Sequence, residues 1–173
     1  MTEDDLGVRG LWDHVNVRLN VDGSRVRRAA ADEGRRGAVE ARLEAAMPED
    51  VHEWWSLADV SADFWIPGGD DVFAPIDLDE AVETREIWLR VSDDEGPPTV
   101  DENGEAEPRF HPRYLPFAHS PGGDGLIVDL RPGASYGAVF VWDHEQWGLG
   151  EPLWASISAM LRDVALTLDH GQR

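Results

Sequence analysis

Three stretches typical of β-strands follow one another in the second half of the chain, separated only by short turns. They cover residues 114–117, 126–130 and 137–145, and glycine and proline punctuate the turns at 120–125 and 131–133. Strands joined by such short turns run antiparallel, because a parallel pair needs a long crossover connection. We therefore expect an antiparallel meander rather than a sheet built from strand–helix–strand units.

Apolar residues at helical spacing lie on both sides of this meander. The spacing predicts helices over about residues 4–19, 39–47, 48–58, 77–89 and 156–168, and one short strand over 64–66. Asp77 with Glu80 resembles a capping pair, and Ser156 is expected to cap the last helix. Residues 24–36 fit either a loop or a frayed helix. The expected fold class is α+β, with a central, mostly antiparallel sheet packed by N-terminal helices and a C-terminal helix.

A chain of 173 residues, of which 42% are hydrophobic and eight are Trp, can bury one core. We expect a single domain over residues 1–173, with its core at about 37–169. Five tryptophans fall in apolar patterns and are expected in that core: Trp12, Trp54, Trp65, Trp88 and Trp142. Residues 92–108 hold seven acids, three prolines and no basic residue, so we expect a mobile acidic loop there.

Acidic residues dominate the middle of the chain. The formal net charge is −20, and residues 43–107 hold twenty acids against two Arg, a net of −18. Such a surface repels nucleic acid and anionic membranes, so neither is expected as a direct partner. It is either a solvated face that serves solubility or a docking face for a basic protein partner. The residues expected to form the docking face are Asp70, Asp71, Asp79, Glu80, Glu83 and Glu86.

The sequence lacks the residues that many catalytic and metal sites need. It contains no Cys and no Lys, which excludes thiol nucleophiles, Cys-ligated zinc and lysine-based catalysis. Residues 133–137 match the G-x-S-x-G pattern, but a strand follows Ser135 where an esterase places a helix. His119 and His144 could meet across neighbouring strands, yet a hydrogen-bonded histidine is commoner than a metal ligand. We expect no catalytic residue, no metal and no cofactor.

The beginning of the chain shows no sign of a targeting segment. The first residues are acidic and lead into no long apolar run, so we expect neither a signal peptide nor a membrane span. The expected compartment is the cytoplasm.

Several short motifs lie in a fixed order along residues 37–169. They are Met47-Pro48, Trp54-Trp55, Phe64-Trp65-Ile66-Pro67, Tyr114-Leu115-Pro116-Phe117-Ala118, Gly122-Gly123-Asp124, Asp129-Leu130, Gly137, Trp142-Asp143-His144-Glu145 and Ser156. This ordered set resembles the SUKH superfamily, in particular its Smi/Knr-type branch. The matching residues are mostly structural: Gly123-Asp124 is expected to fix a turn, and no partner-binding residue is carried over.

The resemblance implies a binding protein rather than an enzyme, on an α+β fold with a central antiparallel sheet. In bacteria, members of this superfamily are often immunity proteins that bind and neutralise toxin domains, frequently nucleases. In fungi, relatives act as scaffolds in the regulation of cell-wall synthesis. Our leading hypothesis is a cytoplasmic immunity protein that occludes a basic toxin domain. The alternatives are a scaffold or regulator with an endogenous partner, and a hydrolase that uses Ser135.

Overall fold

The computed structural model describes residues 7–19, 30–57, 65–94 and 109–171. Its centre is a six-stranded antiparallel sheet in which each strand pairs with the next one along the chain. The strands are β1 (Ile66–Gly68), β2 (Asp71–Pro75), β3 (Tyr114–His119), β4 (Gly125–Asp129), β5 (Val139–Asp143) and β6 (Gly148–Leu149). Strands β3, β4 and β5 confirm the meander that the short turns predict.

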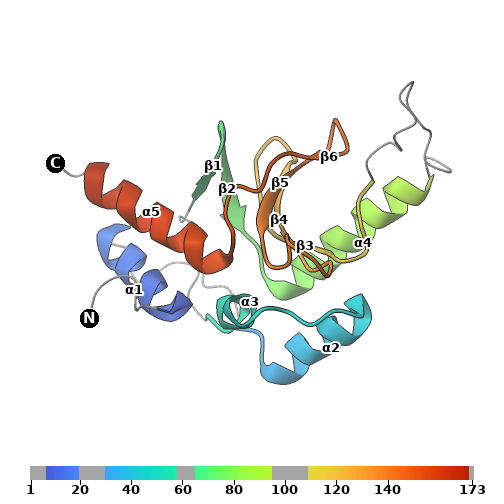
Figure 1. The fold of residues 1–173 in the computed structure, drawn as a ribbon, viewed down its shortest axis with the longest axis horizontal. Helices are drawn as coiled ribbons and strands as arrows, with labels where there is room; N and C mark the ends of the chain where they lie inside the picture. The colour runs from blue at the N-terminus through green and yellow to red at the C-terminus, as the bar shows by residue number, and fades with distance from the viewer. Residues whose placement is uncertain (1–6, 20–29, 58–64, 95–108, 172–173) are drawn as a thin grey trace.

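Helices pack around this sheet. Within the described ranges they are α1 (Val8–Leu19), α2 (Glu33–Leu43), α3 (Glu49–Trp55), α4 (Leu78–Asp94) and α5 (Ile157–Gly171). Figure 1 shows α1 and α5 side by side at one end of the molecule, and α4 beyond the other side of the sheet. Helix α3 contacts both α1 and α5, whereas α4 contacts β3. The predicted α+β class, with helices packed on an antiparallel sheet, is confirmed.

The larger core lies between the sheet and helices α1, α3 and α5. Trp54 of α3 is fully buried, and its ring lies edge-on to Trp12 of α1 and to Phe117 of β3. The ring centroids are 5.8 Å and 5.9 Å apart, respectively. Such aromatic pairs add about 0.5–1.5 kcal/mol beyond the burial of their area. Trp54 therefore joins two helices to the sheet, and both tryptophans occupy the core as predicted.

A smaller aromatic core covers the opposite face of the sheet, because alternate side chains of a strand point to opposite sides. Its buried members are Phe110, Tyr114, Ile127, Ala138, Phe140 and Trp142. Trp88 of α4 packs on this cluster, with its ring centroid 5.2 Å from Phe110 and 6.4 Å from Trp142. The ring lies over Gly125, where a Cβ would come within 2.4 Å of Trp88. Glycine at this position lets α4 approach the sheet.

The β1–β2 hairpin differs from what the sequence predicts. The strand expected over 64–66 begins at Ile66, and β2 has no counterpart among the expected strands. Trp65, expected in the core, is 45% exposed. These strands have only three and five residues and contain proline and glycine. Their sequences therefore show too little alternation of apolar and polar residues to predict a strand or to indicate which side chains point inward.

The start of α5 agrees with the sequence, whereas α2 covers Glu33–Leu43 instead of the expected 39–47. Asp32 caps α2 by accepting a bond from the Arg35 N–H at 2.8 Å, so the last residues of the ambiguous segment 24–36 are helical. The Ser156 Oγ accepts a bond from the Ala159 N–H at 3.1 Å, which confirms the predicted cap of α5.

The acidic loop expected over 92–108 does not begin at residue 92. Helix α4 continues to Asp94, so residues 92–94 are helical, and residues 95–108 lie outside the described part of the chain. Within the described ranges, no helix is both long enough and apolar enough to cross a membrane.

Candidate protein-binding surface

Helix α4 has a buried side and an acidic side. Asp77 caps it, because its Oδ1 accepts a bond from the Glu80 N–H at 2.9 Å. Leu78 and Ala81 are buried, whereas Glu80 and Glu83 are exposed. This is the arrangement that the helical spacing predicts, since residues three or four apart share a face.

A buried arginine fixes α4 against the chain that leads into β3. Arg85 is only 6% exposed, and its Nε and Nη2 donate to the Pro112 carbonyl oxygen at 2.9 Å and 2.6 Å. Burial lowers the pKa of Arg85. Two turns later on α4, the Ser92 Oγ accepts a bond from the Phe110 N–H at 3.2 Å. The exposed carboxylates of α4 therefore lie on a helix that is bonded at two points to the segment leading into β3.

The six acids expected to form one docking face lie in two places. Asp70 and Asp71 lie at the turn between β1 and β2, whereas the other four lie on α4, which follows the far end of β2. Strand β2 alone spans about 13 Å between the two groups. The four acids on α4 are Asp79, Glu80, Glu83 and Glu86. These four form the larger acidic group.

Two of the four acids on α4 form ion pairs with α2. Arg35 pairs with Asp79, and Arg42 pairs with Glu86. The hydrogen bond to the Asp79 carboxylate, followed by its negative charge, raises the pKa of Arg35. The Asp79 side chain nevertheless remains 74% exposed. Because surface ion pairs are screened by water, both pairs can open at little cost in free energy.

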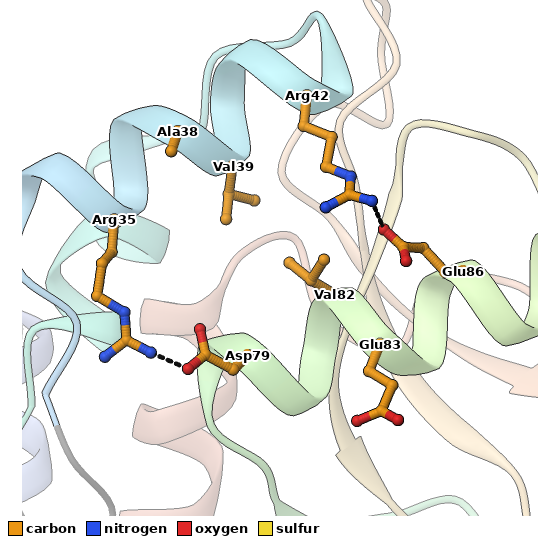
Figure 2. A pocket seen from close by; sticks show the side chains of 8 residues that line it. All are labelled: Arg35, Ala38, Val39, Arg42, Asp79, Val82, Glu83 and Glu86. Atoms are coloured by element: carbon orange, nitrogen blue, oxygen red, sulfur yellow. Dashed lines mark hydrogen bonds and ion pairs between the residues drawn. The ribbon is translucent and has the colours of Figure 1, made fainter.

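A groove of about 360 Å³ lies between α2 and α4, shown in Figure 2. Its lining residues are Arg35, Ala38, Val39, Arg42, Asp79, Val82, Glu83 and Glu86. Figure 2 shows Val39 and Val82 between the two ion pairs, while the Glu83 carboxylate points away from α2. The groove thus has an apolar floor, charged ends and an open carboxylate on the α4 side.

Hydrogen bonds beyond the groove position α2. The Glu40 Oε1 accepts a bond from the Met47 N–H at 2.7 Å and lies 2.9 Å from the His52 Nε2 on α3. Burial acts to raise the pKa of Glu40, but these two bonds, together with the charges of His52 and Arg36, outweigh it and the pKa is lowered. The Tyr136 hydroxyl donates to the Ala46 carbonyl oxygen at 2.8 Å. The segment after α2 is therefore attached both to α3 and to the connection between β4 and β5.

The residues considered for catalysis or metal binding lie in turns and packing contacts of the fold. Residues 133–137 connect β4 to β5, so the G-x-S-x-G pattern is a hairpin connection, as predicted. The His144 Nδ1 lies 2.7 Å from the Asp124 Oδ1, which also accepts the His144 N–H at 3.0 Å. His119 instead packs against Trp88. In the part of the chain that the structure describes, no three His, Asp or Glu side chains gather into a group that could hold a metal ion.

Sequence reasoning did not find the two arginines that complete this surface. Arg35 and Arg42 are seven residues apart, as are Asp79 and Glu86, so each helix presents its charges two turns apart. That matching spacing is visible in the sequence. It becomes informative only once α2 and α4 are known to lie side by side.

A model of a known protein family matches most of the chain. The family model described as SMI1/KNR4 family (SUKH-1) matches residues 33–163, which include α2, α3, α4 and the whole sheet. A search of curated proteins finds no match. Domains of this family are generally binding or regulatory rather than catalytic. Since the family model covers most of the chain, the chain belongs to the SMI1/KNR4 (SUKH-1) family.

Proposed function

We propose that this chain is a non-enzymatic protein-binding domain that neutralises a basic toxin domain by occluding it. The family supports a binding role, and the acidic middle of the chain favours a basic partner. The observation that carries the proposal is the exposed carboxylate side of α4, on a helix tied to the sheet through Arg85 and Trp88.

Electrostatics would act mainly on the approach of the partner. Opposite potentials can raise association rates to about 10⁸ M⁻¹ s⁻¹ at low salt. If the toxin domain is a nuclease, the carboxylates of Glu80 and Glu83 would occupy the basic cleft that otherwise receives phosphates. Neutralisation would then be stoichiometric, with one chain covering one toxin active site.

Co-expression tests this proposal. The gene next to the one that encodes this chain is expressed alone and together with the full chain, and cell survival is measured. We expect the neighbouring product to be toxic alone, and the chain to restore survival and form a 1:1 complex with it in size-exclusion chromatography. A non-toxic neighbour, together with a stable complex with an endogenous host protein, would overturn the immunity proposal in favour of the scaffold.

A further inference from the structure

We propose that the groove between α2 and α4 receives one lysine or arginine side chain of the protein partner. This inference rests on the proposed function and deepens it, because it names the site and the chemistry that the site recognises. It is argued from the shape of the groove, its charges and the one carboxylate that α2 leaves unpaired.

The floor of the groove suits an aliphatic stem. Val39 is buried, and Val82 is partly buried against the core, so both are held in place from below. Ala38, on the same side as Val39, is exposed and small. The two ion pairs stand about 10.5 Å apart along each helix, since seven residues separate their members. A single long side chain fits between them.

The charges of the groove suit a cationic head. Three carboxylates line it, on Asp79, Glu83 and Glu86, against the two guanidinium groups of Arg35 and Arg42. Those two guanidinium groups are paired with Asp79 and Glu86. The Glu83 carboxylate forms no hydrogen bond or ion pair with any other described residue. The lining residues therefore have a net charge of −1.

These two properties together select the class of side chain. Lysine and arginine lay an apolar stem along a hydrophobic surface while their charged heads stay at its edge. The stem would cross the groove over Val39 and Val82, and the head would reach Glu83 at the outer edge of α4, where its carboxylate points away from α2. An acidic side chain would meet the excess negative charge, and a purely aliphatic one would leave Glu83 without a partner.

Two variants with matched controls separate this site from the general acidity of the chain. Ala38→Leu fills the groove, whereas Ala41→Leu adds the same side chain to another exposed position of α2 that does not line it. Glu83→Gln removes the unpaired carboxylate, whereas Glu80→Gln makes the same charge change on α4 outside the groove. Equal melting temperatures within each pair establish that a variant and its control are equally folded.

The probes are two short peptides, acetyl-Leu-Lys-Leu-amide and acetyl-Leu-Gln-Leu-amide, titrated into the ¹⁵N-labelled full chain. We expect the lysine peptide to shift the amide signals of Ala38, Val39, Val82 and Glu83, and the glutamine peptide to shift them much less. Ala38→Leu should abolish these shifts, while Ala41→Leu retains them. Glu83→Gln should weaken binding about threefold more than Glu80→Gln does, as expected for a partly exposed charge pair.

Two results would overturn the inference. One is equal binding of both peptides, which would show an apolar groove without preference for a cation. The other is a set of shifts spread over the acidic surface and insensitive to Ala38→Leu. Co-expression with the toxin keeps this failure separate from failure of the proposed function: if Ala38→Leu still restores survival as wild type does, the chain neutralises its partner through another surface.

Discussion

Two histidines, His119 at the end of β3 and His144 just after β5, have opposite environments. His119 lies mostly buried, with its ring centroid 5.8 Å from that of Trp88, and its Nε2 has no hydrogen-bond partner among the described residues. Burial lowers the pKa of His119. The hydrogen bond to Asp124 raises the pKa of His144, although slight burial opposes it. Their contributions to stability should therefore change with pH in opposite directions.

For His119, the unfolded chain takes up a proton more readily than the folded one. Its contribution is full above the ordinary histidine pKa of about 6.5 and is lost as the pH falls below that value. His119→Phe keeps a ring against Trp88 but does not titrate. We expect its melting temperature to fall less than that of wild type between pH 7.5 and pH 5.5. A parallel fall in both proteins would mean that His119 keeps an ordinary pKa in the folded state.

For His144, the folded chain holds the proton more tightly. The stabilisation is full below the ordinary pKa and is lost as the pH rises through the raised one. We therefore expect His144→Ala to cost more stability at pH 5.5 than at pH 8.5, measured by urea unfolding at both values. An equal cost at the two pH values would contradict a raised pKa, and would leave only the neutral hydrogen bond to Asp124.

At the scale of the elements, the contact between Trp88 and Gly125 decides how closely α4 packs on the sheet. A methyl group at residue 125 would overlap the Trp88 ring, which Phe110, His119 and Trp142 hold from other sides. Gly125→Ala should cost about 1–3 kcal/mol through overpacking. Gly148→Ala is the control, because its nearest neighbouring atom would be 3.7 Å away. Equal melting temperatures for both variants would show that α4 shifts freely.

The Ser156 hydroxyl caps the start of α5. Ser156→Ala removes the acceptor for the Ala159 N–H, and should cost about 0.5–2 kcal/mol. Ser158→Ala, in the first turn of the helix, leaves that acceptor in place and serves as the control. Chemical denaturation of both variants measures the difference. A loss confined to Ser158→Ala would place the helix start elsewhere.

Elements with strong local signals are the ones that the sequence predicts. Asp77 and Ser156 cap their helices through side chains that act within three residues, so no knowledge of the rest of the fold is needed. Strand β2 is different, because its five residues carry no clear alternation and only Ala74 and Pro75 pair with the distant strand β3. Arg85 is different again: a charged residue is expected in solvent, and only the Pro112 carbonyl explains its burial.

For the whole molecule, the question is whether the negative charge acts locally or as a diffuse field. Replacing Glu80 and Glu83 with Arg changes the net charge by +4 on the exposed side of α4. Replacing the exposed Asp13 and Glu151 makes the same change elsewhere. We expect the first variant to associate more slowly with the proposed toxin partner and to show a weaker salt dependence of that rate. Stopped-flow binding at several salt concentrations measures both.

Two other outcomes of comparing these double variants would change the interpretation. Equal slowing in both double variants would indicate a diffuse field without a localised docking face. Unchanged rates in both would indicate that the acidity serves solubility alone.

The candidate surface could be predicted from the sequence only in part. Helical spacing indicates that Glu80 and Glu83 face outward, and they do. The pairing of Asp79 with Arg35 could not be predicted in this way, because it depends on how α2 is placed by Glu40 and Tyr136. The separation of Asp70 from α4 likewise depends on the unexpected hairpin.

The packing of α1 against α5 affects how the protein folds while it is synthesised. Val8, Leu11, Trp12 and Val15 of α1 are all buried, yet α5 follows about 140 residues later in the chain. At about 5–20 residues per second, a ribosome needs roughly 7–30 s to make that stretch. Throughout that time the apolar side of α1 lacks the cover that α5 provides, although α3 is available to pack against it. We expect the burial of α1 to be completed only after α5 has been synthesised.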